Sequence, residues 1–170
     1  MQTLLAESNA PNLIEVPALK HTQPASLTVV TPQKYVTSLE DEITLRNVAN
    51  QLMTNAVIAA AQPALWVSYQ LDWEGAWREH IAGWKQTPIV AFIAWSFRGL
   101  PETFSAALND ALIHRVMNEM TTIVTCSCDP LLLTPRWESD RAVLSALRKP
   151  AMRVRVLNDY DIRVERKVSK

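Results

Sequence analysis

The chain has 170 residues, 48% of them hydrophobic, and its 17 lysine and arginine residues balance 17 acidic residues. It contains only three glycines, whereas usual glycine content would give about a dozen. This scarcity argues against the phosphate-binding loop of P-loop enzymes and the dinucleotide fingerprint, because both need closely spaced glycines. The balanced charge gives the whole chain no net attraction to nucleic acid or to a membrane.

The sequence predicts a single domain without a membrane segment. Its longest strongly apolar run, residues 89–95, is far shorter than the ~20 residues that cross a bilayer. Residues 1–9 lack the basic start and apolar core of a secretory signal, and two cysteines do not form a disulfide framework. We therefore expect a soluble protein of the cytoplasm, or of a particle assembled there, with no membrane partner.

Residues 1–36 contain few charged residues and no helical periodicity, but they hold four of the ten prolines. Within them, residues 25–31 favour a strand because Leu27, Val29 and Val30 are apolar or β-branched. We interpret the stretch as an extended arm that lies against another molecule, with Leu27 and Val29 as contact residues. A disordered linker is the alternative that the composition allows.

Residues 38–61 carry the clearest helical signal. Ser38 can cap the helix, and the acidic residues that follow it suit the positive end of the helix dipole. Apolar residues then recur at near-helical spacing from Ile43 to Ile58, and Pro63 follows the end of the helix.

The next stretch, residues 65–86, supports two interpretations. Aromatic residues, together with Ile81, recur three or four positions apart between Trp66 and Trp84, as they would along one face of a helix. Alternatively, residues 65–71 alternate as a strand does, and Asp72 caps a shorter helix. A tryptophan-rich helix face usually packs in the core, and a partner-binding groove is the alternative.

Three further elements are expected before the C-terminal end. Residues 89–97 are apolar enough for a buried strand or a buried helix, and their pattern fits both. Pro101 and Glu102 open a helix that extends to about residue 120. Residues 121–128 are rich in threonine, isoleucine and valine, which predicts a strand.

The C-terminal end predicts a helix followed by a β-hairpin. Ser139 or Asp140 can cap the helix, which must end before Pro150. Apolar residues then alternate with charged ones, mostly arginines, in residues 152–156 and 162–166, and asparagine and aspartate between them favour a turn. We expect this hairpin to have one apolar face and one arginine-bearing face.

Together these elements predict an α+β fold, with three or four helices and a small antiparallel sheet that includes the C-terminal hairpin. Residues 1–36 form the arm, and residues 37–170 form a single domain. Within that domain, residues 37–128 are the helical middle and residues 129–170 are the basic helix-plus-hairpin end.

Two groups of residues invite a chemical interpretation, but each lacks what its chemistry needs. Cys126 and Cys128 would share a strand face as two zinc ligands can, but no second close pair of ligands accompanies them. Asp110 and His114 would share a helix face, but they lack the Glu-x-x-His spacing of di-iron bundles. We therefore interpret both cysteines as buried reduced thiols. We expect no catalytic residue, metal, cofactor or small-molecule substrate.

Charge is unevenly distributed along the chain, with a net −5 over residues 1–135 and a net +5 over residues 136–170. Head-to-tail contacts between ends of opposite charge build rings or filaments, whereas a basic hairpin also suits a phosphate backbone. An ordinary solvated hairpin whose charges protect a sheet edge is the third interpretation. The basic candidate contact residues are Arg148, Lys149, Arg153, Arg155, Arg163 and Lys167.

We expect a non-enzymatic structural subunit of a larger assembly, such as a virion or another multiprotein machine. Its partners would be other proteins or copies of itself, contacted through the N-terminal arm and the basic hairpin. A nucleic-acid-binding module that uses the hairpin is the alternative, and nucleic acid is then the partner. A small cysteine-dependent enzyme is a second alternative.

Overall fold

The computed structural model describes residues 5–7, 14–68, 77–95, 102–158 and 161–167. Four α-helices lie in these ranges: α1 (Leu39–Ala60), α2 (Trp77–Gln86), α3 (Glu102–Met117) and α4 (Asp140–Arg148). Two short 3-10 helices accompany them, η1 (Pro17–Leu19) and η2 (Pro130–Leu132). None of the helices in the described ranges is both long and apolar enough to cross a membrane.

Within the described residues, seven strands form one mixed sheet: β1 (Leu5–Glu7), β2 (Leu27–Pro32), β3 (Ala64–Ser68), β4 (Ile89–Trp95), β5 (Thr121–Cys126), β6 (Met152–Val156) and β7 (Ile162–Arg166). Their order across the sheet is β1-β3-β4-β5-β2-β6-β7. The five central strands are parallel, whereas β1 and β7 each run antiparallel to their one neighbour. The C-terminal hairpin therefore extends a parallel sheet and ends it at β7.

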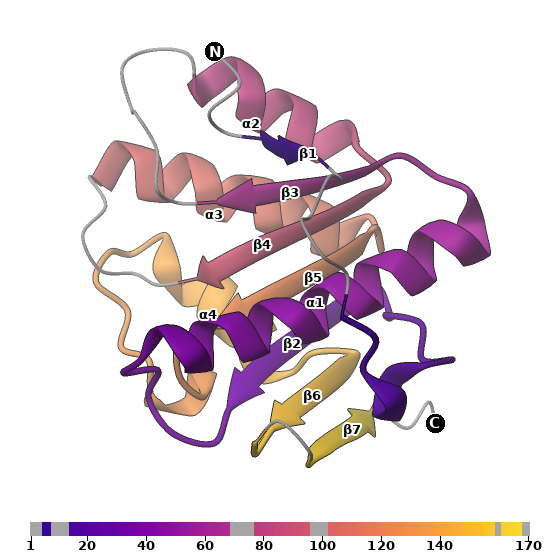
Figure 1. Ribbon diagram of the computed structural model, residues 1–170. Helices are drawn as coiled ribbons and strands as arrows, with labels where there is room; N and C mark the ends of the chain where they lie inside the picture. The colour runs from indigo at the N-terminus through magenta and orange to yellow at the C-terminus, as the bar shows by residue number, and fades with distance from the viewer. Residues whose placement is uncertain (1–4, 8–13, 69–76, 96–101, 159–160, 168–170) are drawn as a thin grey trace.

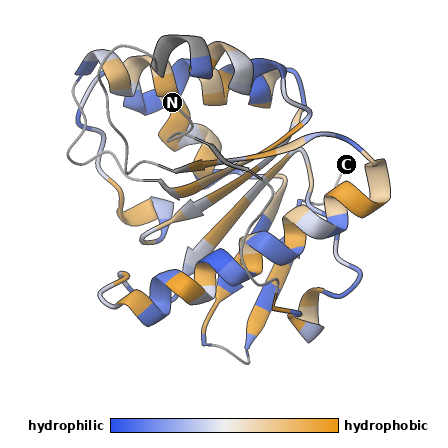
Figure 2. Cartoon of the chain, turned by 45° about the horizontal axis from the view of Figure 1, so that its top comes forward, coloured by the Kyte–Doolittle hydropathy of each residue, from blue (hydrophilic) through white to orange (hydrophobic). Residues whose placement is uncertain are grey.

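Helices cover both faces of the sheet (Figure 1). α1 packs on one face, and α2, α3 and α4 pack on the other. Successive side chains of a strand point to opposite faces, so Val29 and Val30 of β2 lie in two different hydrophobic clusters. Figure 2 shows hydrophobic residues concentrated in the strands between the helical layers. The central strands are therefore buried on both sides, which is typical of parallel sheets.

The long helix α1 forms as its sequence predicts. The side chain of Ser38 accepts a hydrogen bond of 3.2 Å from the backbone N–H of Asp41 and so caps the first turn. At the other end Ala61 adopts a left-handed conformation, with φ of 49°, and its N–H donates to the carbonyl of Val57. Both ends are therefore set by local signals.

The α+β class fits this combination of four described helices with a mixed sheet, but the expected small antiparallel sheet is wrong. The sheet has seven strands, and its centre is parallel. Both ambiguous segments contain strands, β3 and β4. Trp66 and Trp84 therefore lie on different elements and are buried in opposite clusters, while Tyr69 and Trp73 of the aromatic pattern lie outside the described residues.

The described part of residues 1–36 packs inside the domain and does not extend from it as an arm. β2 is an interior strand between β5 and β6, and it pairs in parallel with both. Before it, the side-chain amide of Asn55 on α1 donates to the carbonyls of Leu19 and Thr22, each at 2.7 Å. The partners of β2 come from far downstream in the chain, so the local composition could not reveal this pairing.

A buried arginine ties together the ends of several elements. Arg115 on α3 is fully buried, and its guanidinium donates to the carbonyls of Trp84, Thr87, Pro88 and Thr121 and to the hydroxyl of Thr122. These acceptors belong to the end of α2, to the short connection between α2 and β4, and to the start of β5. Burial lowers the pKa of Arg115 to about 10, so the side chain stays charged at neutral pH.

A buried carboxylate likewise connects several elements near the start of α4. Asp140 is fully buried, and its two oxygens accept hydrogen bonds from the backbone N–H groups of Arg136 and Trp137 and from the side chains of Ser105 and Asn109. The bond from Asn109 is 2.7 Å long. Asp140 therefore joins α3 and the segment before α4, with all its partners supplied from within the domain.

Candidate interaction surface at the C-terminal hairpin

The C-terminal hairpin forms in the predicted register. β6 and β7 are antiparallel, with Val154 opposite Val164. At the turn, the N–H of Asp161 donates to the side-chain oxygen of Asn158 at 2.9 Å, and the N–H of Leu157 donates to the carbonyl of Asp161 at 2.9 Å. These are the turn-forming roles for which asparagine and aspartate are favoured.

The two faces of the hairpin differ as the alternation predicts. Met152, Val154 and Val156 are buried in the cluster beneath α1. Arg153 and Arg155 are half-buried on the opposite face, where they lie across from Glu165 and Arg163 of β7. The arginine-bearing face is therefore on the side of the sheet that α2, α3 and α4 cover.

Four of the predicted contact residues meet at one end of the hairpin. A shallow pocket of about 380 Å³ is lined by Arg148, Lys149, Pro150, Arg153, Glu165, Arg166 and Lys167. Arg155 and Arg163 lie farther along the hairpin, near its turn. The basic residues thus form a continuous surface, but one that includes a glutamate.

Several of these charges already have partners within the chain. Arg148 donates to the carbonyls of Pro130 and Leu133, each at 3.1 Å, and so holds the loop around η2. Arg155 lies 3.3 Å from a carboxylate oxygen of Glu165, and Arg163 lies 3.8 Å from one of Asp161. The surface is consequently less basic than its composition indicates, which weakens its fit to a run of phosphates.

The outer side of β7 carries backbone groups that face no described strand, because β7 ends the sheet. In an antiparallel ladder, hydrogen-bonded residue pairs alternate with non-hydrogen-bonded pairs. The backbone N–H and C=O groups of a non-hydrogen-bonded pair point away from the partner strand. The N–H of Lys167 donates to the carbonyl of Ala151, and Leu157 pairs in the same way with Asp161. Counting from these two hydrogen-bonded pairs, the backbone groups of Arg163 and Glu165 also bond to β6. The backbone N–H and C=O groups of Ile162, Val164 and Arg166 therefore point outward.

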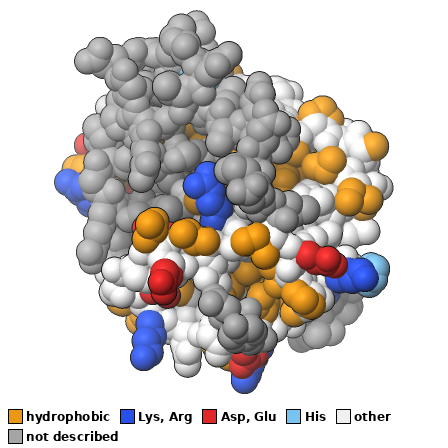
Figure 3. All heavy atoms as spheres, in the orientation of Figure 1, with side chains coloured by type: hydrophobic (Ala, Val, Ile, Leu, Met, Phe, Trp, Pro, Cys, Tyr) orange, Lys and Arg blue, Asp and Glu red, His pale blue; other side chains and the backbone are white. Residues whose placement is uncertain are grey.

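An apolar groove lies beside this edge on the α1 side. A hollow of about 470 Å³ is lined by residues 14–17, by the first half of α1 and by Ile162 of β7. Its lining is mostly apolar, but it also includes Glu15, Glu40, Thr44 and Asn47. Ile14 and Ile43 in this groove are 52% and 47% exposed. Figure 3 shows hydrophobic side chains exposed at several places on the face that α1 covers. The open edge thus has an apolar flank on one side and the arginine-bearing face on the other.

Leu27 and Val29, proposed from sequence as contact residues of an arm, are not available for contacts. They lie on β2, in the interior of the sheet, and are 4% and 0% exposed. The predicted strand exists, but Leu27 and Val29 fill the core on the side of α2, α3 and α4, and Val30 fills the core beneath α1. The sequence did not reveal the open edge of β7, because finding it requires the phase of the hydrogen-bond ladder.

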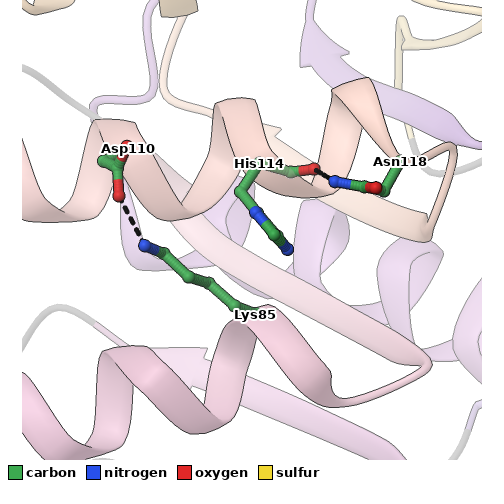
Figure 4. Close-up of polar contacts among 4 residues, drawn as sticks. All are labelled: Lys85, Asp110, His114 and Asn118. Atoms are coloured by element: carbon green, nitrogen blue, oxygen red, sulfur yellow. Dashed lines mark hydrogen bonds and ion pairs between the residues drawn. The ribbon is translucent and has the colours of Figure 1, made fainter.

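The described residues with metal-ligating chemistry do not gather into a site. The carboxylate of Asp110 lies 2.5 Å from the ammonium of Lys85, and the side chain of His114 stands apart from that pair (Figure 4). Asn118 donates to the backbone carbonyl of His114 (Figure 4). Among the described residues, no group of three or more histidine, cysteine or acidic side chains could hold a metal ion.

Cys126 and Cys128 are both buried and are not joined in a disulfide. Burial, reinforced by the nearby Cys128, raises the pKa of the Cys126 thiol well above its usual range. Because the thiolate is the nucleophile, Cys126 in this position is a weak one at neutral pH.

The carboxyl ends of the parallel strands, where ligands bind in many such sheets, hold a pocket of about 220 Å³ between β2 and β6. Lys34, Asp41 and Asn158 are among its polar lining. Three acidic residues, Glu40, Asp41 and Glu42, fill the first turn of α1 beside it, and they repel the anionic ligands that a helix N-terminus otherwise attracts.

Comparisons with known proteins leave this surface as the main guide to function: the chain matches no model of a known protein family, and a search of curated proteins found no similar sequence.

Proposed function

We propose that this protein is a non-enzymatic structural subunit that contacts neighbouring proteins or copies of itself through its C-terminal hairpin. A virion or another multiprotein machine is the expected setting. The observation that carries this proposal is the open edge of β7, with an apolar groove on one side and an arginine-bearing face on the other. Strand edges flanked by apolar surface are recurrent docking sites for other protein segments.

This function is tested by purifying the full-length chain from the cells that naturally make it and measuring the mass of the complex. We expect a complex of defined stoichiometry, and we expect Arg163→Glu on the open edge to release the partner. Arg141→Glu is the matched control, because it makes the same charge change at an exposed residue of α4. The proposal is contradicted if the chain is monomeric both in the cell extract and after purification.

Nucleic acid binding is the second candidate, and the basic pocket at the end of the hairpin favours it. It predicts binding of DNA or RNA that weakens steeply with salt and weakens further when Arg153, Arg155 and Arg163 are changed to glutamine. We expect the assembly function instead, because Glu165 and the carbonyl partners of Arg148 compete with phosphate for these cations. The absence of binding at low salt removes this candidate.

A cysteine-dependent enzyme is the least supported function, because burial keeps Cys126 as a thiol. Thiol labelling of the native protein at neutral pH tests it. We expect Cys126 to react only after unfolding, whereas rapid labelling of the native chain would indicate an activated nucleophile.

A further inference from the structure

We propose that two copies of this chain pair through β7, antiparallel about a two-fold axis at Val164, so that the seven-stranded sheet continues into a second copy. The inference rests on the proposed assembly function and names its partner as this same chain. It follows from three properties of β7: the direction of its backbone groups, the order of its charges and the apolar groove beside it.

The backbone groups of β7 fit this pairing completely. The outward N–H and C=O groups belong to Ile162, Val164 and Arg166. With the axis at Val164, this residue bonds Val164 of the partner subunit in both directions. Ile162 then bonds Arg166 of the partner subunit, and the reverse pair forms by symmetry. Every outward group of the described strand gains a partner.

The charges select the same register. With the axis at Val164, Arg163 lies opposite Glu165 of the partner subunit, and Glu165 lies opposite Arg163 of the partner subunit. Moving the axis by one residue places Arg163 opposite its own copy, or Glu165 opposite its own copy, and like charges directly opposite destabilise a strand pair. Each further shift of the axis leaves more residues of β7 without a paired residue on β7 of the partner subunit.

The same order of charges distinguishes β7 from an edge that is protected against pairing. Protective charges on an edge strand repel another strand that approaches. Here opposite charges stand on either side of Val164, so the two-fold operation brings each charge to its opposite. The segment from Arg163 to Glu165 is therefore complementary to itself in the antiparallel direction. At the ends of the strand Ile162 lies opposite Arg166 of the partner subunit, and the side chain of Arg166 donates to the carbonyl of Gln23 in its own chain.

The α1 side supplies apolar surface next to this contact. Val164 is 37% exposed and would meet its own copy at the axis. Ile162, beside it on the same side of the sheet, lines the groove that also holds the exposed Ile14 and Ile43. Strand pairing alone buries less area than a stable interface needs. The apolar part of this groove, beside Ile162, is the surface over which the contact would extend.

Charge exchange on the purified chain alone tests the pairing. Arg163→Glu gives two glutamates on the edge, Glu165→Arg gives two arginines, and each variant repels its own copy. We expect each to dimerise about ten- to one-hundred-fold more weakly than the natural chain in sedimentation velocity or light scattering. Mixing the two variants places opposite charges together in both pairs, so we expect a mixed dimer. The variant with both changes should again dimerise with itself.

Two further variants separate pairing from folding. Val164→Pro removes an outward N–H while leaving the ladder to β6 intact, and it should abolish the dimer. Val164→Thr keeps the N–H and the strand propensity, and it should retain the dimer. All variants should keep the native circular dichroism spectrum, and Arg141→Glu should dimerise as the natural chain does.

The outcomes separate this inference from the proposed function. A monomeric natural chain at all concentrations overturns the pairing through β7, as does a dimer that none of the edge variants weakens. A purified monomer that still joins another protein in its own cells through the hairpin overturns the self-pairing but supports the assembly function. A chain that is monomeric both alone and in its own cells contradicts both.

Discussion

Arg115 and Arg163 carry the same guanidinium group into opposite surroundings. Arg115 is fully buried, and its donors meet four carbonyls and one hydroxyl from the end of α2, the short connection between α2 and β4, and the start of β5. Arg163 stands exposed on the edge strand β7, and a carboxylate 3.8 Å away is its nearest described counter-charge. The fold needs the first arginine, whereas the second leaves most of its hydrogen-bonding capacity to another molecule.

The acidic residues repeat this contrast. Asp140 is fully buried and accepts four hydrogen bonds that join α3 to the start of α4. Glu165 lies exposed on β7, with one arginine 3.3 Å away. Buried charges in this protein thus connect elements, and the charges on β7 are arranged along an open edge. The difference predicts which substitutions change folding and which change only association.

Replacing Arg115 should have the largest effect. Arg115→Met keeps the bulk of the side chain but leaves five acceptors, two buried and three half-buried, without their donor. We expect a loss of about 3–5 kcal/mol in the free energy of unfolding. Urea denaturation measures this loss. The exposed Arg141→Met is the control and should change the free energy by less than about 0.5 kcal/mol. A loss below about 1 kcal/mol for Arg115→Met contradicts the role of Arg115 as a connection.

Replacing Asp140 should have the next largest effect. Asp140→Ala removes the acceptor of two backbone N–H groups and of the Ser105 and Asn109 side chains. We expect the free energy of unfolding to fall by about 2–4 kcal/mol. Asp140→Asn retains one oxygen and should lose about half as much. Thermal unfolding of the three proteins side by side gives the order. Equal stability of the alanine and asparagine variants would show that the carboxylate is not the connection.

The sequence predicted the elements whose signals are local. Ser38 and the acidic residues after it marked the start of α1, and Pro150 marked the end of α4. The alternation of apolar and charged residues marked both strands of the hairpin. The parallel centre was missed because β2 pairs with strands about a hundred residues downstream, and no local pattern encodes such pairs. The choice between helix and strand at residues 65–71 was likewise settled by packing against neighbouring strands, since the described part of this segment belongs to β3.

The candidate surface was also predicted only in part, because some of its features depend on contacts between distant parts of the chain. Clustering of positive charge at the C-terminal end is visible in the sequence, and the structure brings Arg148, Lys149, Arg153 and Lys167 to one pocket. Which of these cations are already bonded within the chain, and which backbone groups of β7 face outward, depend on tertiary contacts. Leu27 and Val29 failed as contact residues because an apolar strand between prolines fits an arm and a central strand equally well.

Neutralising Arg163 should have the smallest effect on folding, which makes it the sharpest test of the contrast. Arg163→Gln removes an exposed charge, so the free energy of unfolding should change by less than about 0.5 kcal/mol. The measurement belongs at protein concentrations where monomer predominates, because dimerisation adds its own stabilisation by mass action. The same substitution should weaken self-association, since Glu165 of the partner subunit loses its counter-charge. A loss of more than about 1 kcal/mol in the monomer would instead place Arg163 among the residues that hold the fold, as Arg115 does.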